Sequence, residues 1–236
     1  DKVDYAFLGA FALPRVRPHA HLSVQSGSDN ILRSMARRYD SRRVADAVAG
    51  LRSARHDPFI GFDLIAGFPG ESDTDFSSTL SLVEDTGPAW AHVFTYSPRP
   101  GTRAYGFGNR VPERVAVERA AVLRAHALRL HEAFALRRVG TVMDAVAETA
   151  DRDHDHDVST ASDPDRTVGG AVCRGSPVTG RSHVVYATST DYLHLAVAGV
   201  PEGLRGTMRC RVTGPAPTLH AQGPDGGADL LAVWQP

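Results

Sequence analysis

Residues 59–71 read Phe59-Ile-Gly-Phe-Asp-Leu-Ile-Ala-Gly-Phe-Pro-Gly-Glu71, and this stretch decides the fold of the first half of the chain. Residues 59–66 are apolar except for Gly61 and Asp63, which is typical of a strand buried on both faces of a parallel α/β sheet. The glycines and the proline of residues 67–71 end that strand in a turn. Because α/β proteins bind ligands beyond the carboxyl ends of their strands, this turn is the first candidate for a functional site.

Two other stretches have the same build. Residues 19–24 are strand-like and run into the polar turn Gln25-Ser-Gly-Ser-Asp29, and residues 90–96 run into Ser97-Pro-Arg-Pro-Gly-Thr102. Apolar residues at helical spacing lie between them: Val44, Val48 and Leu51 after Asp40, and Phe76, Leu80 and Val83 after Asp73. Strand, turn and helix in repetition predict parallel strands joined by right-handed crossovers. Three strands cannot close a barrel, so we expect either a partner segment that this chain lacks or a sheet whose open edge is poorly protected.

The chain changes character after residue 139. Residues 112–138 predict one long helix, with Pro112 in its first turn and Gly140 as its stop, whose apolar stripe is Ala116, Ala120, Leu123, Ala127, Leu130 and Phe134. Short segments bounded by Gly, Pro, Ser or Asp then predict strands at residues 142–149, 183–188, 192–197, 204–213 and 230–234. Such strands favour a small oligonucleotide-binding-like barrel. We therefore expect two domains, residues 1–139 and 140–236, with an acidic disordered insertion at about residues 151–179.

Length and composition indicate a globular chain. Its 236 residues are 42% hydrophobic, and no apolar run approaches the roughly 20 residues of a membrane span. No signal peptide precedes the first strand, so we expect a cytoplasmic protein without a membrane partner. The net charge of -1 conceals an uneven distribution, with nine Arg and three Glu in residues 99–138 and six Arg and two acidic residues in residues 166–214. These basic stretches either face phosphate or are solvated faces, and composition leaves both open.

Several motifs resemble a known enzyme family in their order and spacing. They are His19-x-His-Leu-Ser-x-Gln-Ser-Gly-Ser-Asp29, Met35-Ala-Arg-Arg-Tyr39, Gly67-Phe-Pro-Gly-Glu71 and His92-Val-Phe-x-Tyr-Ser-Pro-Arg-Pro-Gly-Thr102. Together they resemble the C-terminal half of the radical S-adenosylmethionine (SAM) methylthiotransferases. The last motif is most similar to the branch that acts on N6-threonylcarbamoyladenosine next to the tRNA anticodon, with the isopentenyladenosine branch as the alternative. The resemblance implies half of a radical SAM (β/α) barrel followed by a small all-β, RNA-binding TRAM barrel.

The resemblance also implies that SAM is bound where the predicted strands end. The residues assigned to the cofactor are Gln25, Ser26, Ser28, Asp63, Gly67, Gly70, Glu71, Tyr96 and Arg99. Structural interpretations stay open beside this one: the Ser26 turn caps a helix, Asp63 pairs with an arginine, and Arg99 lies in a loop stiffened by proline. The residues assigned to RNA are Arg205, Arg209 and Arg211. No catalytic residue is predicted.

Iron is where the chain departs from the family pattern. The family holds one 4Fe-4S cluster through Cys-x3-Cys-x2-Cys and another through three N-terminal cysteines, whereas this chain has only Cys173 and Cys210. Two cysteines in the C-terminal part ligate neither cluster, and we predict no metal site. The tract His154-Asp-His156 and the strand pair His19 and His21 are weaker candidates, for which solvated and cofactor-lining roles are favoured.

We therefore expect a fragment or truncated product of a tRNA methylthiotransferase that lacks the cluster-binding half and is inactive alone. Its expected partners are tRNA and that N-terminal half. Two other classes stay open: a non-catalytic RNA-binding module, and an unrelated α/β-barrel enzyme that binds a small substrate at the turns of Gln25 and Glu71. The cofactor hypothesis requires Ser26, Glu71 and Tyr96 to lie on one side of the molecule.

Overall fold

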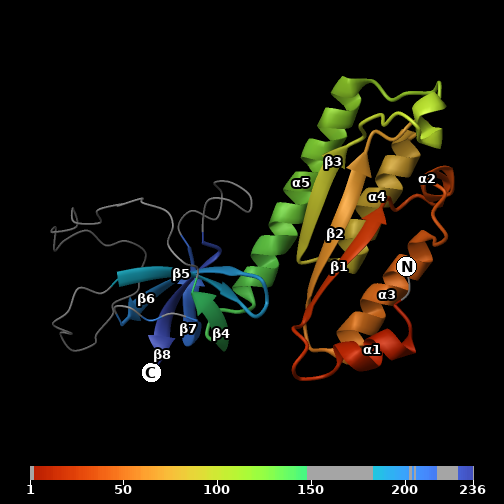
Figure 1. Cartoon of the computed structure of the whole chain (residues 1–236). Coiled ribbons are helices and arrows are strands. Elements are labelled where there is room, and N and C mark those ends of the chain that lie inside the picture. The colour runs from red at the N-terminus through yellow and green to blue at the C-terminus, as the bar shows by residue number, and fades with distance from the viewer. Residues whose placement is uncertain (1–2, 148–182, 202–203, 205, 217–227, 236) are drawn as a thin grey trace.

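The computed structural model describes residues 3–147, 183–201, 204, 206–216 and 228–235. They form an α/β unit and a β-barrel, and the longest helix, α5, runs from one to the other (Figure 1). The helices are α1 (Tyr5–Phe11), α2 (Asp29–Ser34), α3 (Ser41–Ala54), α4 (Asp73–Thr86), the 3-10 turn η1 (Arg103–Gly106) and α5 (Glu113–Leu136). The strands are β1 (His19–Gln25), β2 (Phe59–Ala66), β3 (Trp90–Thr95), β4 (Val142–Ala147), β5 (His183–Ser189), β6 (His194–Val200), β7 (Thr207–Pro215) and β8 (Leu230–Gln235).

The first three strands form a parallel sheet in the order β1-β2-β3. Phe62 in the central strand pairs in register with Leu22 on one side and with Ala91 on the other. Their carboxyl ends therefore point to the same edge of the sheet, as the arrowheads in Figure 1 show. The predicted three-stranded parallel sheet, which closes no barrel, is confirmed within the described residues.

Helix starts follow the local capping chemistry. Asp40 accepts a hydrogen bond from Arg43 N–H and caps α3. At α4 the cap is Ser72, which forms a reciprocal capping box with Asp75. Both helices that the apolar spacing predicts, after Asp40 and after Asp73, are thus present.

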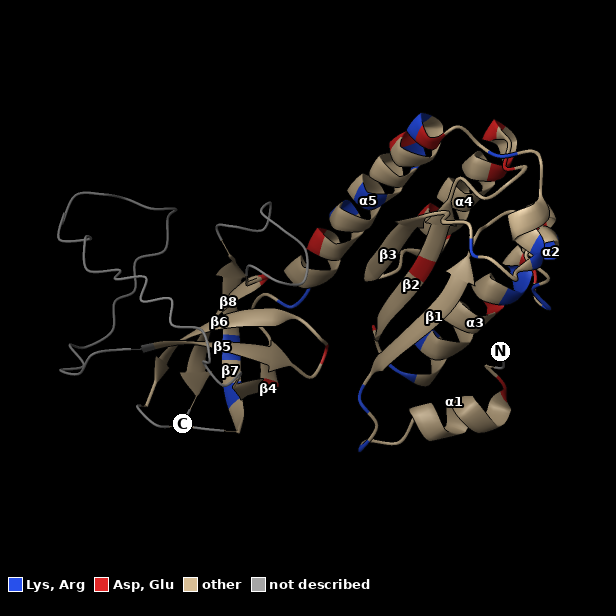
Figure 2. Cartoon of the chain, turned by 45° about the horizontal axis from the view of Figure 1, so that its top comes forward, with Lys and Arg blue, Asp and Glu red and all other residues tan. Residues whose placement is uncertain are grey.

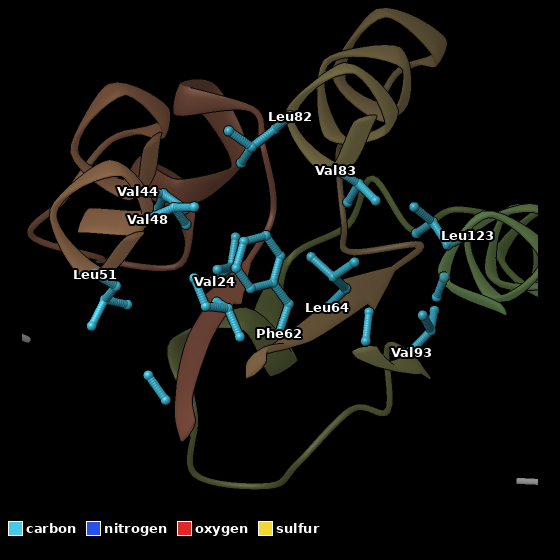
Figure 3. Packing of buried hydrophobic residues seen from close by; sticks show 14 of the residues in the cluster. Val24, Val44, Val48, Leu51, Phe62, Leu64, Leu82, Val83, Val93 and Leu123 are labelled. Carbon is cyan, nitrogen blue, oxygen red and sulfur yellow. The ribbon is translucent and has the colours of Figure 1, made fainter. Parts of the chain in front are cut away.

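The helices cover one face of the sheet and bury an apolar core there. Alternate residues of the central strand, Ile60, Phe62 and Leu64, are fully buried and belong to one hydrophobic cluster with residues of α3, α4 and α5. Figure 3 shows this packing, with Phe62 and Leu64 lying among side chains that include Val48, Val83 and Leu123. Burying a side chain of this size stabilises a fold by about 1.5 to 3 kcal/mol, so this face supplies much of the stability of the unit.

Helix α5 carries the predicted apolar stripe. Five of the six residues of this stripe are buried, and the sixth, Leu130, is partly buried against the same core. Its last turn changes partners: Phe134 packs edge-on against Phe59 and joins the core of the barrel. Helix α5 therefore connects the two hydrophobic cores.

The remaining strands close a barrel in the order β4-β5-β6-β8-β7. Alternate residues point inward, among them Ala145, Leu195, Cys210 and Leu230, all fully buried. All five predicted strands are present, although their ends differ by up to three residues. The predicted insertion at 151–179 lies outside the described residues. No helix of the described part is long and apolar enough to span a bilayer.

Candidate functional site

The turn after β1 is held by helix α4. Ser26 is fully buried, and its hydroxyl lies 3.1 Å from the Thr79 hydroxyl while accepting a hydrogen bond from Ser28 N–H. The Ser28 hydroxyl donates to Asp75 and accepts from Ile31 N–H as the cap of α2. Both serines thus have structural partners. Gln25 precedes them with φ 68°, a left-handed conformation that is costly for this residue type.

The turn after β2 is built around a buried ion pair. Glu71 accepts hydrogen bonds from Gly67 N–H at 2.9 Å and from the Arg119 guanidinium at 2.8 Å. Arg119 comes from α5, and its other nitrogen donates to Asp73 at 2.6 Å. A Cβ on Gly67, which has φ 78°, would lie 2.3 Å from the Ala116 Cβ. Glycine is therefore required at Gly67 by its conformation and by the close approach of α5.

Burial and hydrogen bonding have opposite effects on the pKa of each member of this ion pair. Burial raises the pKa of the Glu71 carboxyl, and the hydrogen bonds from Gly67 and Arg119 oppose that rise. Burial would lower the pKa of Arg119, but its hydrogen bonds to Asp73 and Glu71 raise it. The guanidinium thus stays charged, and it fixes the turn against α5. Gly70 N–H is likewise taken, by the Asn109 carbonyl at 2.8 Å.

The segment after β3 differs because it leaves a polar atom without a partner. Tyr96 packs its ring edge-on against Phe68, with 5.2 Å between the ring centroids. Its hydroxyl oxygen is buried and has no hydrogen-bond partner among the described residues. A buried hydroxyl without a partner costs about 1 to 3 kcal/mol, which a polar ligand group would recover. Arg99, three residues further on, is exposed.

Ser26, Glu71 and Tyr96 thus follow three neighbouring parallel strands at a single edge of the sheet. They lie on one side of the α/β unit, as the cofactor hypothesis requires. Ser26 and Glu71 are buried and form hydrogen bonds with residues of α4 and α5, whereas the Tyr96 hydroxyl has no hydrogen-bond partner among the described residues. At this edge, the turns after β1 and β2 are thus fixed by hydrogen bonds to α4 and α5, whereas the segment after β3 has a hydroxyl group that can still bind a ligand.

The second face of the sheet is polar, and no helix of the described residues covers it. Asp63 lies there with its side chain 27% exposed, and it accepts hydrogen bonds from His21 Nε2 at 2.8 Å and Ser23 Oγ at 3.2 Å. His92 of β3 lies beside His21, with 5.4 Å between ring centroids. We call Ser23, His21, Asp63 and His92 the polar face. Its carboxylate is held in place by two neighbours and remains partly open to a further donor.

Gly61 makes the polar face possible. A Cβ at this position would lie 2.6 Å from His21 Nδ1, so any larger residue would push the imidazole off the sheet. The lower end of the same face is closed by the barrel, since His19 stacks on Phe59 and on Tyr192. Burial and the nearby His21 lower the pKa of His19. Of the two strand histidines, His19 is thus part of the junction and His21 part of the polar face.

Sequence analysis did not single out Ser23, His92, Gly61 or Arg119 for the site. Ser23, His92 and Gly61 could have been found from the sequence, because alternate residues of a strand share one face. That face carries residues 19, 21 and 23 of β1, residues 61 and 63 of β2, and residues 90 and 92 of β3. For Arg119 there was no such signal, since its partner Glu71 is 48 positions away.

The candidate RNA residues lie on the barrel. Arg209 and Arg211 are exposed residues of β7, a strand of the barrel that is labelled in Figure 2. Arg209 is 3.3 Å from Asp144, and Arg211 donates to the Gly140 carbonyl. Both are exposed, so their guanidinium groups can also meet a polyanion. Arg205 lies outside the described residues.

The thiol of Cys210 is not placed to bind an iron–sulfur cluster. Cys210 is fully buried inside the barrel, where its Sγ lies 3.6 Å from the Met143 carbonyl oxygen, and burial raises its pKa. Cys173 and the His154-Asp-His156 tract lie outside the described residues. Within the described residues, no three His, Cys, Asp or Glu side chains are grouped so as to hold a metal ion.

Comparison with known proteins identifies relatives of one kind. A threonylcarbamoyladenosine tRNA methylthiotransferase, MtaB, of Treponema pallidum is 50% identical over 119 residues, which are 50% of this chain and 25% of that protein. A tRNA-2-methylthio-N(6)-dimethylallyladenosine synthase of Nitratidesulfovibrio vulgaris is 38% identical over 194 residues, 80% of this chain and 43% of the relative. The corresponding synthase of Nitrosospira multiformis is 38% identical over 157 residues, 66% of this chain and 33% of the relative.

No protein-family model matches the chain. Among solved structures, coproporphyrinogen III oxidase (HemN) of Escherichia coli, described as a radical SAM enzyme, aligns with 55% of this chain and 30% of its own at a TM-score of 0.48 and 17% identity. The chain spans less than half the length of the curated relatives it matches. The resemblance drawn from the motifs is nevertheless confirmed by sequence: the chain is a homologue of part of the tRNA methylthiotransferases.

Proposed function

We propose that this chain is the portion of a tRNA methylthiotransferase that lines the SAM site and contacts tRNA, and that its substrate base is N6-threonylcarbamoyladenosine. The single observation that carries the proposal is the 50% identity over 119 residues to the relative of that name. Over a similar stretch of 106 residues, the dimethylallyladenosine synthase of Thermus thermophilus is 45% identical. In this proposal residues 1–139 are half of a radical SAM barrel and residues 140–236 a TRAM-like barrel.

The polar face and the strand ends fit SAM chemically. SAM carries a cationic sulfonium and ammonium group, a carboxylate, ribose hydroxyls and a purine. The partly exposed Asp63 carboxylate can accept hydrogen bonds from the ribose hydroxyls or from the ammonium group. The Tyr96 hydroxyl has no hydrogen-bond partner among the described residues, and a polar group of the cofactor can supply one. The exposed Arg99 suits the carboxylate of the methionine part.

The buried residues of the edge have a different role in the proposal. Gln25, Ser26, Ser28, Gly67, Gly70 and Glu71 shape the turns rather than point their side chains at the cofactor. The contacts of Ser26 with Thr79 and of Glu71 with Arg119 hold these turns rigid, and rigid turns are what positions a ligand. When bound, SAM supplies the radical chemistry and the methyl group.

Iron–sulfur clusters do not fit the thiols of this chain, whose two cysteines include the buried Cys210. We therefore derive no step through a cluster from these residues. The proposal requires a further polypeptide segment with the cluster cysteines as a partner, and the chain alone is expected to be inactive.

The test is direct binding of SAM and of tRNA to the purified chain. By calorimetry, Asp63→Asn should weaken SAM binding about tenfold, since a hydrogen bond to a charged group contributes about 1.5 kcal/mol. Asp85→Asn, at an exposed position of α4, is the matched control and should bind SAM normally. Equal affinity of the wild type and Asp63→Asn would remove the polar face from the SAM site.

The RNA part has its own measurement. The dependence of tRNA affinity on salt should lose about one unit of slope for each of Arg209→Ala and Arg211→Ala, because each arginine meets one phosphate. Arg114→Ala, exposed on α5, is the control. If tRNA binds in this way and SAM does not bind at all, the chain is a non-catalytic RNA-binding module.

A further inference from the structure

His131 of α5 lies where the two units meet, and its two ring nitrogens have unusual partners. Nδ1 is 2.9 Å from the carbonyl oxygen of Ala89, the residue before β3, and Nε2 is 2.9 Å from Asp229 Oδ1, next to β8 of the barrel. The His131 side chain is 9% exposed, so bulk water has little access to its ring nitrogens. One side chain thus joins the helix, the sheet and the barrel.

The chemistry of these partners determines the protonation of the ring. A peptide carbonyl only accepts hydrogen bonds, and an ionised carboxylate only accepts. A neutral imidazole donates from one nitrogen and must accept at the other, so it leaves one of these contacts as a repulsion between lone pairs. Only the imidazolium, with a proton on each nitrogen, satisfies both contacts.

Asp229 is itself fixed by the barrel. Its second oxygen accepts the backbone N–H of His194 at 2.8 Å, and its own N–H donates to the His194 carbonyl at 2.7 Å. The carboxylate therefore cannot follow the imidazole if that contact is lost. Because Ala89 is buried in the same core as Phe134, neither acceptor is free to move away.

We propose that His131 is a doubly protonated clamp that fixes the barrel against the sheet, and that this clamp opens when the imidazole loses a proton. The charged and titratable groups that face it are Asp229 from the barrel and Glu132 on its own helix. From the sheet, the Trp90 ring lies edge-on with 5.0 Å between the ring centroids, and its Nε1 donates to His92 Nδ1. The inference concerns the coupling of the two units and does not depend on the proposed RNA or SAM binding.

The direction of the pKa agrees with this geometry. Burial alone would lower the pKa of His131, but Asp229 and the Ala89 carbonyl raise it above its ordinary value. A raised pKa in the folded state contributes stability that is complete below the unfolded pKa of about 6.5 and is lost as the pH rises through the folded pKa. The junction should therefore loosen on the alkaline side.

The experiment compares the wild type with Asp229→Asn. An asparagine oxygen still accepts the His194 N–H, and its amide now donates to Nε2, so a neutral imidazole satisfies every contact. The midpoint of thermal unfolding of the wild type should fall as the pH rises from 6 to 9. In Asp229→Asn this pH dependence should disappear while the variant stays folded. His126→Gln, at a partly buried position of the same helix where the imidazole lies 3.5 Å from Glu84, is the control and should show the pH dependence of the wild type.

Two direct readouts complete the test. Nitrogen-15 NMR of the His131 ring should show two protonated nitrogens at pH 6.5 and a pKa above that of a free histidine. Trp90 emission should rise as the clamp opens, because an imidazolium quenches a neighbouring indole more than a neutral ring does; Trp234→Phe removes the other tryptophan. A His131 ring that is neutral at pH 6.5, with the proton on Asp229 or absent, overturns the proposal, as do identical pH profiles for the wild type and Asp229→Asn.

Discussion

The two faces of the three-stranded sheet carry neighbouring residues of the same strands and have opposite roles. On the covered face, Phe62 is fully buried among α3, α4 and α5. On the other face, the adjacent Asp63 is partly open and bonded to His21 and Ser23. One position along a strand thus separates a residue that holds the fold from one available to a ligand.

This difference teaches that burial, rather than polarity, decides what a residue contributes to stability. The edge of the sheet shows it best, since Glu71 and Arg119 are ionic and yet buried like core residues. The comparison therefore ranks four substitutions by the free energy of unfolding that each should remove.

Phe62→Ala should have the largest effect. Removing a fully buried aromatic ring leaves a cavity between the sheet and three helices, which costs about 4 kcal/mol. Phe94→Ala is the matched control, because Phe94 lies on the other face of β3 and is 55% exposed. It should cost less than about 1 kcal/mol. Chemical denaturation measures both, and similar losses for the two would contradict the contrast between the faces.

Arg119→Ala should follow, with a loss of about 3 kcal/mol. It leaves the Glu71 carboxylate buried with only the Gly67 N–H as a partner, and a stranded buried charge is strongly destabilising. Arg114→Ala removes an exposed pair with Glu118 on the same helix and should cost about 0.3 kcal/mol. Arg119 is buried and also binds Asp73, whereas Arg114 is exposed and pairs with Glu118 alone. Equal costs for the two variants would argue against burial as the deciding quantity.

The sequence was sufficient for the elements whose signals are local. The helices after Asp40 and Asp73, the stripe from Ala116 to Phe134 and the three strands were all predicted correctly because each depends on residues a few positions apart. The interpretation of residues 59–66 as buried on both faces holds only partly. The helices cover one face and the barrel covers the lower end of the other, so Asp63 and Ile65 are only half-buried.

The site was harder because its contacts are long-range. The residues around the turns were predicted, but that Ser26 is bonded to Thr79 and Glu71 to Arg119 depends on how α4 and α5 pack on the sheet. The clamp between His131 and Asp229 joins residues 98 positions apart, which no local pattern could indicate. Polar residues that are buried by tertiary packing are thus what sequence patterns miss.

A third, smaller loss of stability should appear at acid pH, and it involves Asp57, which precedes β2 at the amino end of the sheet. Asp57 is paired with Arg137 and Arg138, which overcome the opposing effect of burial and lower its pKa to about 2. A lowered pKa gives stability that is present above the unfolded value of about 3.8 and is lost as the pH falls through 2. Allowing for partial exposure, the loss should be about 1 to 2 kcal/mol between pH 4 and pH 2.

Asp57→Asn isolates this effect, since asparagine tolerates the left-handed backbone at this position, where φ is 42°. Acid unfolding followed by circular dichroism should show the wild type losing more stability than the variant between pH 4 and pH 2. Parallel curves for the two proteins would mean that Asp57 titrates normally in the folded state.

Asp63→Asn should have the smallest effect on stability, within about 0.5 kcal/mol, although its sequence neighbour Phe62 should have the largest. The amide keeps the size of the side chain, and His21 and Ser23 can turn their hydrogen bonds to it because the face is partly open to water. The same variant should weaken SAM binding about tenfold if the polar face is the cofactor surface. A large loss of stability with unchanged SAM affinity would instead place Asp63 with Glu71, among the charges that hold the fold.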